Sequence, residues 1–292
     1  HINPTFKTVS AMTKRILTLH CKDRSGIVAA VATCLSNADC NIEEASQFND
    51  PLSGQFFMRV VVKPLNEAAL DLFSKNFELI ATEFEITWKM NNPELPVKTL
   101  ILVSKTDHCL NDILYRWRTK HLNIDIVAIA SNHNDNRSLA EERGIAYHHY
   151  PITKETKAEQ EDQIRNLISA TGAELIVMAR YMQILSSEFC QDFTGQVINI
   201  HHSFLPGFKG ARPYHQAYER GVKIIGATAH FATLDLDEGP IIEQNIVRID
   251  HSYPPEKLQI LGRDTESRVL AKAIDLYCDR RIFLQGNRTV IL

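Results

Sequence analysis

The chain has 292 residues, more than one domain usually contains, so two domains are expected. Hydrophobic residues make up 44% and charged residues 23%, as in ordinary globular proteins, and the formal net charge of -3 gives no sign of nucleic-acid binding. No apolar run approaches the ~20 residues of a membrane helix, and no signal-peptide pattern opens the chain.

The 6 cysteines lie far apart in the sequence and form no CxxC pair. This distribution favours reduced, buried thiols over a disulfide framework or a zinc site. We therefore expect a cytoplasmic protein. The residues before Met12 are consistent with an expression remnant and carry no information about the fold.

A first domain is predicted over residues 14–90. Strands are expected at 16–21, 41–48, 56–62 and 85–90, and helices at 28–35 and 67–80, because the apolar residues recur with those periods. The order βαββαβ is that of the ferredoxin-like split βαβ arrangement.

The loop Cys21-Lys22-Asp23-Arg24-Ser25-Gly26-Ile27-Val28, with the later Asn41-Ile42, resembles the ACT family of small-molecule regulatory domains. Members of that family often hold a free amino acid near this loop, although many have proline at the position of Ser25. The resemblance implies an effector such as methionine or glycine, bound by Asp23, Gly26, Ile27 and Asn41. The residues alone also allow an alternative, in which Asp23 and Gly26 only start a helix and no ligand binds. The outer strands of such a sheet also predict a homo-oligomer.

Residues 91–96 are the predicted linker, because they contain two prolines and no apolar periodicity. Beyond it, residues 97–292 are predicted to form an α/β domain. Strands are expected at 97–104, 124–130, 146–150, 175–179 and 196–200, and helices at 110–120, 139–143 and 159–171. The alternation predicts a mostly parallel, Rossmann-like sheet with helices on both faces. The sequence has no GxGxxG, P-loop or GxSxG motif, so no cofactor is expected.

Polar residues follow the last of these strands. Residues 197–210 run from an apolar strand into His201, His202 and a loop rich in proline and glycine. Asn199 and His201 project to the same side of an extended strand, and strand ends in α/β sheets are where small ligands bind. Taken alone, a polar strand end that satisfies nearby backbone groups is an equally good interpretation.

A second polar segment, residues 232–240, lies between strands expected at 223–231 and 241–247. It contains Asp235 and Asp237, and taken alone a solvated turn is favoured. Asp237 is the preferred candidate of the two, and Asp235 is expected to be structural.

Taken together these segments resemble the formyltransferase family that uses 10-formyltetrahydrofolate. The resemblance rests on Asn199-Ile200-His201 with Ser203-Phe204-Leu205-Pro206, and on Leu236-Asp237 with Gly239-Pro240. Residues 179–186 match the segment that lines the folate pocket in that family, and the resemblance spans residues 97–292. The ACT-like domain, the second histidine at His202 and Pro213-Tyr214-His215-Gln216 resemble the deformylase branch. Arg212 and Leu234 depart from the family pattern.

The resemblance implies hydrolysis of 10-formyltetrahydrofolate to formate and tetrahydrofolate, supplying formate for purine synthesis and balancing one-carbon folate pools. Asn199 and protonated His201 would stabilise the oxyanion, because negative charge on the formyl oxygen needs donors aimed at it. Asp237 would handle the water and the proton transfer. The implied substrate-binding residues are Met182, Gln183, Ile184, Leu185, His202, Leu234, Asp235 and Leu236, with Lys209 and Arg212 attracting the glutamate tail. For the apolar residues after the strand, an ordinary core position is the alternative.

The start of the first helix of the second domain favours water as the acceptor. Relatives that formylate a phosphorylated amine cradle its phosphate there, whereas residues 105–110 contain no glycine and one aspartate. A formyltransferase acting on an amine and a catalytically silent amino-acid sensor remain the alternatives. A metal hydrolase is disfavoured, because the histidines are not spaced along the sequence as metal ligands usually are. They are His148, His149, His201, His202, His215, His230 and His251.

Overall fold

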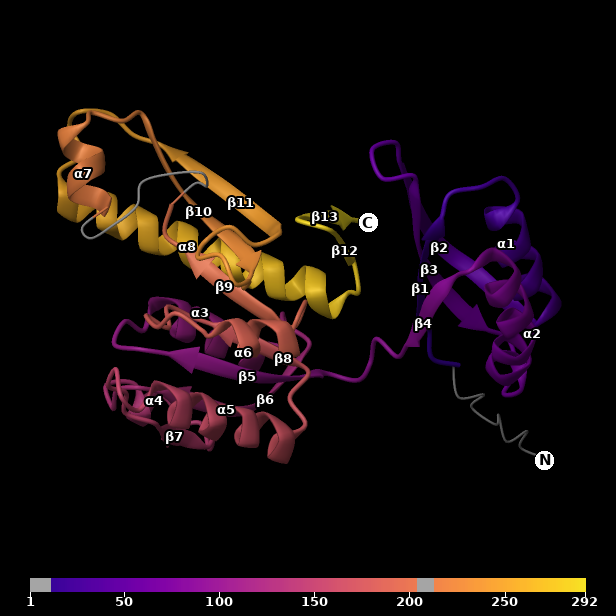
Figure 1. Cartoon of the computed structure of the whole chain (residues 1–292), viewed down its shortest axis with the longest axis horizontal. Helices are drawn as coiled ribbons and strands as arrows, with labels where there is room; N and C mark the ends of the chain where they lie inside the picture. Colours follow the sequence, from indigo (N-terminus) through magenta and orange to yellow (C-terminus); the bar gives the residue numbers. More distant parts are fainter. Residues whose placement is uncertain (1–11, 204–212) are drawn as a thin grey trace, which may run out of the picture. The chain divides into compact units, whose positions relative to one another are not determined.

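The computed structural model of the chain describes residues 12–203 and 213–292, and divides into two compact units between Leu95 and Pro96 (Figure 1). Lys209, Arg212 and the motif residues 204–206 therefore lie outside the described residues. In the described part of the chain, no helix has both the length and the apolar character needed to span a membrane.

The N-terminal unit has the predicted βαββαβ order, in an antiparallel sheet with the strand order β2-β3-β1-β4. Its elements are β1 (Arg15–Lys22), α1 (Ile27–Asn37), β2 (Cys40–Asp50), β3 (Gln55–Pro64), α2 (Ala69–Phe84) and β4 (Thr87–Asn91). Alternate residues of β3, including Met58 and Val60, are buried with Phe73 and Phe77 of α2. The last strand begins later than predicted, because α2 continues to Phe84 and ends in a left-handed residue, Glu85.

The C-terminal unit is built on a sheet of seven strands in the order β11-β10-β9-β8-β5-β6-β7. The predicted parallel part is confirmed: β5 (Val97–Val103), β6 (Ile124–Ser131), β7 (Tyr147–His149), β8 (Leu175–Met178) and β9 (Val197–His201). Two further strands, β10 (Ile224–Phe231) and β11 (Ile241–Arg248), extend the sheet antiparallel. A separate hairpin, β12 (Ile282–Gln285) and β13 (Arg288–Ile291), closes the unit.

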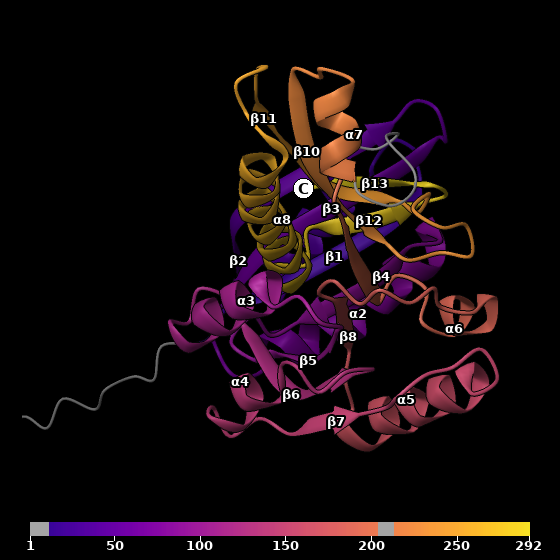
Figure 2. The same ribbon diagram turned by 90° about the vertical axis from the view of Figure 1, so that its left-hand side faces the viewer.

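Helices cover both faces of this sheet, as predicted (Figure 2). They are α3 (His108–Arg118), α4 (Arg137–Glu141), α5 (Lys157–Thr171), α6 (Ser187–Asp192), α7 (Pro213–Glu219) and α8 (Pro255–Cys278). Residues of β5 alternate between the two faces: Ile101 is buried with α3 and α8, whereas Leu100 is buried with α5 and α6. The order of strands reverses between β5 and β8, so their carboxyl ends flank the position where α/β sheets usually bind ligands.

Candidate functional site

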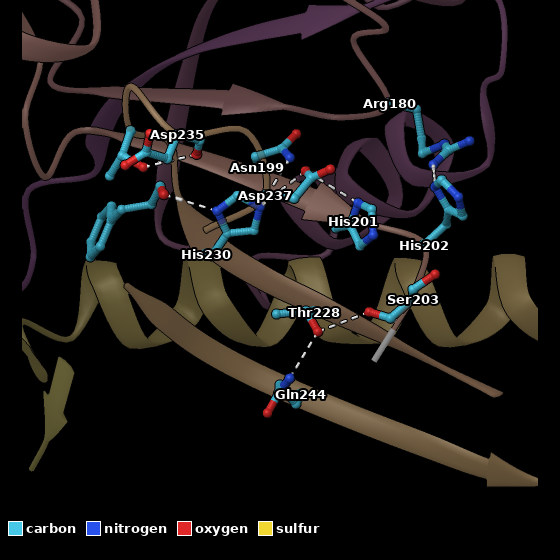
Figure 3. Close-up of polar contacts among 12 residues, drawn as sticks. Arg180, Asn199, His201, His202, Ser203, Thr228, His230, Asp235, Asp237 and Gln244 are labelled. Atoms are coloured by element: carbon cyan, nitrogen blue, oxygen red, sulfur yellow. Dashed lines mark hydrogen bonds and ion pairs between the residues drawn. The ribbon is translucent and has the colours of Figure 1, made fainter. Parts of the chain in front are cut away.

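The predicted Asn199 and His201 lie at the carboxyl end of β9, and both face a cavity that Asp237 also lines. The antiparallel neighbour β10 places His230 directly opposite Asn199 in the strand register. Asp237 comes from the loop between β10 and β11. Strand β9 on one side and β10 with its following loop on the other thus bring two histidines, an asparagine and an aspartate together (Figure 3).

Asp237 is the centre of this group. Its Oδ1 lies 3.2 Å from His201 Nδ1 and 3.7 Å from His230 Nε2. Burial raises the pKa of this carboxyl, the hydrogen bond with His201 and its charge lower it, and the pKa is held below its usual value. Asp237 is therefore an anion that accepts a hydrogen bond from the His201 imidazole.

The loop that carries Asp237 is folded back on itself. Asp237 has a φ of 58°, a left-handed conformation uncommon outside glycine, and Glu238 N donates to Asp235 O at 3.3 Å. The loop is therefore not extended at this position. Asp235 is exposed, whereas Asp237 points at the histidines.

His230 is the site residue that sequence reasoning missed, since it counted only among histidines of a rejected metal site. Its side chain is 2% exposed, and its Nδ1 lies 2.9 Å from the carbonyl oxygen of Phe231. A carbonyl only accepts, so Nδ1 carries a proton. In the neutral ring Nε2 then accepts from Asn199 Nδ2 at 3.2 Å, which fixes which way the Asn199 amide points. The strand register, had it been known, would have identified this residue.

Gly239 allows the loop to pass close to β10. A Cβ at this position would lie 1.8 Å from the carbonyl oxygen of Phe231 and 3.2 Å from His230 Nδ1. We expect Gly239→Ala to displace Asp237 and lower kcat by about 100-fold, since a displacement of about 1 Å can have that effect. Steady-state kinetics alongside a thermal melt would test this, and an unchanged kcat in a folded variant would contradict it.

Two adjoining cavities surround the aspartate. One is lined by Arg180, Tyr181, His201 and His202, and the other by Leu185, Cys190, His230 and Ala232. Both are lined by Met178, Gln183, Ile184, Asn199, Leu236 and Asp237. Of the other predicted substrate-binding residues, Met182 lines the first cavity and Asp235 the second, and Leu234 lines neither.

Several apolar side chains at these cavities are exposed. Met182 is 59%, Ile184 55% and Leu236 55% exposed, so the core position considered for the first two is wrong. Leu185, at 8%, does belong to the core. Ser104, at the end of β5, holds this segment through a 2.9 Å hydrogen bond from Met182 N to its hydroxyl. A rim of exposed apolar residues around a polar centre suits a flat, largely apolar ligand.

His202 also lines the first cavity, and its Nδ1 lies 3.0 Å from Nη1 of Arg180. Burial, followed by the charges of Arg180 and His201, lowers the pKa of His202 to about 4. The unfolded chain binds this proton near the usual value of 6.5, so folded-state stability falls as the pH drops from 6.5 towards 4.

Over this pH range we expect the free energy of unfolding to fall less in the His202→Gln variant than in the wild type. The difference between the two losses should be at most about 3 kcal/mol. Urea unfolding of both proteins at pH 6.5 and 4.5 measures the difference. Parallel losses in the two proteins would contradict the prediction.

One group of potential metal ligands occurs among the described residues, and it lies outside the Asp237 centre. His108, Cys109 and Glu266 have ligand atoms within 4.8 Å of one another. Burial, followed by the charge of Glu266, raises the pKa of the Cys109 thiol far above its usual value. The side chains of His108 and Glu266 are hydrogen-bonded to each other, and Glu266 also accepts from the Tyr214 hydroxyl.

The four predicted effector residues lie in the N-terminal unit. Asp23 accepts a 2.8 Å hydrogen bond from Asn49 Nδ2, and Gly26, with a φ of 96°, precedes the first residue of α1. Ile27 is 2% exposed and belongs to the core. Asn41 and Asn49 lie near opposite ends of β2, so at about 3.3 Å per residue Asn41 is remote from Asp23 within one chain.

Comparison with known proteins gives one consistent result. The family model described as formyl transferase matches residues 97–274. The chain is 47% identical to a formyltetrahydrofolate deformylase from Corynebacterium sp. (strain P-1), over 97% of this chain and 100% of that protein. A Synechocystis protein of the same name is 45% identical over 94% and 97%. The crystal structure of formyltetrahydrofolate deformylase from Burkholderia mallei is similar with a TM-score of 0.92 and 49% identity, covering 96% of this chain and 99% of that one.

Proposed function

The chain belongs to the formyltetrahydrofolate deformylases of the formyl transferase family, and we propose that it hydrolyses 10-formyltetrahydrofolate to formate and tetrahydrofolate. The observation that carries the chemistry is the convergence of Asn199, His201 and Asp237 beside a cavity with an exposed apolar rim. The formate released would supply reactions that consume it, purine synthesis among them.

The proposed reaction is the addition of water to the formyl carbon. The water oxygen forms the new C–O bond, the π electrons of the formyl group move onto its oxygen, and Asp237 accepts a proton from the water. Asn199 and His201 donate to the resulting oxyanion, as preorganised donors do in acyl transfer. The oxyanion then re-forms the carbonyl as the C–N10 bond breaks, and the proton on Asp237 passes to N10. Tetrahydrofolate leaves, and the formic acid loses its remaining proton to solvent as formate.

His230 orients this machinery rather than touching the substrate. Its Nδ1 proton is held by the Phe231 carbonyl, its Nε2 accepts from the Asn199 amide, and the same nitrogen lies near Asp237. The Asn199 side chain is thereby fixed before substrate binds. Preorganisation of this kind makes a hydrogen-bond donor effective in the transition state.

Water as the acceptor is supported by the start of α3. Asp107 precedes the helix and accepts from Asn111 Nδ2 at 2.8 Å, while His108 Nε2 lies 2.7 Å from Glu266 Oε2. A carboxylate at a helix N-terminus disfavours a phosphate there by charge. A phosphorylated amine is accordingly a poor second substrate for this site.

The proposal is tested with the purified protein, 10-formyltetrahydrofolate and buffer that contains no amine. Formate and tetrahydrofolate are expected in equal amounts, in proportion to the enzyme added. Product that forms only after an amine acceptor is supplied would indicate a transferase instead. Absence of turnover under both conditions would indicate a silent sensor.

We further propose that the N-terminal unit is an ACT regulatory domain of a homo-oligomeric enzyme. The βαββαβ order and the Asp23 loop support this assignment. Because Asn41 lies far from Asp23 within one chain, a site that uses both would need two copies.

Methionine or glycine is expected to change either the melting temperature or the turnover of the wild type, and to have a smaller effect on Asp23→Ala. Thermal melts and initial rates with each amino acid, together with light scattering for the mass, measure this. An equal response in the variant, or a monomeric enzyme, would contradict the proposal.

A further inference from the structure

A buried polar cluster adjoins the site on the side of His202. Glu266 of α8, 1% exposed, accepts from His108 Nε2 at 2.7 Å and from the Tyr214 hydroxyl at 2.9 Å. Arg180 Nε lies 3.5 Å from the same carboxylate, and Arg180 Nη1 donates to His202 Nδ1 at 3.0 Å. The chain of contacts thus runs from the middle of α8 to the residue next to His201.

The backbone is adapted to this cluster in two places. Arg180 has a φ of 65°, a left-handed conformation that a non-glycine residue adopts only when its surroundings hold it there. Gly262, inside α8, leaves room for Tyr214, because a Cβ there would lie 1.9 Å from the tyrosine hydroxyl oxygen. Glycine in a helix interior lowers the stability of the helix relative to alanine. At this position it allows the Tyr214 hydroxyl to reach Glu266.

Four buried polar atoms at or near the cluster have no hydrogen-bond partner among residues 12–203 and 213–292. They are Thr106 Oγ1, His108 Nδ1, Arg180 Nε and His202 Nε2. Buried polar atoms in folded proteins are normally paired with protein groups or with bound water. Unpaired atoms contributed by three separate chain segments therefore indicate bound water on this side of the site.

The tautomer of His202 follows from its partner. A guanidinium only donates, so His202 Nδ1 accepts and the ring proton is on Nε2. The His202 ring centre is 4.8 Å from that of His201, and both rings line the first cavity. The backbone after His202 is fixed as well, because Thr228 Oγ1 donates to the Ser203 carbonyl at 2.9 Å. An N–H donor with no partner is thus held beside the proposed oxyanion donor.

We propose that His202 Nε2–H binds the water that attacks the formyl carbon, and that Arg180 and Glu266 are positioning residues that hold His202 as this donor. This inference rests on the proposed hydrolysis. The hydrogen bond occupies one lone pair of the water and leaves the other for the formyl carbon. One water proton then passes to Asp237, and the other stays on the oxygen until the formic acid that is released loses it to solvent as formate.

The charges around His202 favour the neutral ring that this role requires. Burial, Arg180 and His201 disfavour its protonation, while Glu266 and Asp237 favour it, and the pKa of His202 is lowered to about 4. Protonation would place a hydrogen on Nδ1, where Arg180 also donates, and would therefore break the Arg180 contact. Removing Arg180 removes one of the charges that keep His202 neutral.

The first test compares His202→Asn with His202→Gln. Glutamine reaches as far as Nε2 and restores a donor there, whereas the shorter asparagine does not. We expect kcat to fall about 100-fold in His202→Asn and clearly less in His202→Gln, with KM for 10-formyltetrahydrofolate close to the wild-type value in both. Equal losses in the two variants, or none, would overturn the assignment. Melting temperatures and folate binding by fluorescence confirm that each variant is folded.

The second test is the pH dependence of kcat for Arg180→Gln. The acid limb of the profile is expected to move to higher pH than in the wild type, and the double variant Arg180→Gln/His202→Gln should lack that shift. An acid limb that does not move, or that moves equally in the double variant, would overturn the role of Arg180. Failure of the wild type itself to release formate would instead contradict the proposed function.

Discussion

Asp237→Asn is expected to lower kcat by about 100-fold to 1,000-fold, while the affinity for a folate ligand stays near the wild-type value. Asparagine retains the size of the side chain and an oxygen that can accept from His201, but it carries no charge and cannot take a proton from water. It also removes the anion that lies 3.2 Å from His201 and 3.7 Å from His230. Single-turnover kinetics and folate titration separate the two effects.

The matched control for this variant is Asp235→Asn, in the same loop. Asp235 is exposed, and its backbone carbonyl accepts from Thr233 Oγ1 and from Glu238 N. The control should therefore retain most of the wild-type kcat. Near-wild-type turnover by Asp237→Asn, or equal losses in both variants, would remove the role assigned to Asp237.

His201→Asn is expected to lower kcat by a similar factor, about 100-fold or more. The shorter amide still reaches towards Asp237 in place of Nδ1, but nothing replaces the distal Nε2 that is proposed to donate to the oxyanion. Because His201 and Asp237 act on the same transition state, the double variant should lose little more than either single variant. Fully additive losses in the double-mutant cycle would show that the two residues act independently.

The order of elements was largely predictable, because apolar periodicity marks strands and helices along the chain. The spacing of Asn199 and His201 at the end of a buried strand also pointed to a site. Strands were predicted at 223–231 and 241–247, close to the observed β10 and β11, but their antiparallel direction was not, since strand patterns do not reveal direction or partner. For that reason His230 was missed, although it faces Asn199 in the register.

The role of Glu266 was also beyond sequence reasoning. It lies in α8, a helix that was not predicted and whose apolar pattern is interrupted by Gly262 and Thr265. Its partners come from the start of α3, the segment after β8 and α7, so only the tertiary fold brings them together. The conformation of the Asp237 loop was equally inaccessible, because a left-handed aspartate is held by its surroundings rather than by its own preference.

The most direct test of the account is the fate of the solvent oxygen. The wild-type enzyme is incubated with unlabelled 10-formyltetrahydrofolate in water enriched in oxygen-18, without any amine, and the products are analysed by mass spectrometry against an enzyme-free control. One labelled oxygen is expected in each formate and none in tetrahydrofolate. Formate without label, or a formyl group recovered on another molecule, would contradict hydrolysis at Asn199, His201 and Asp237.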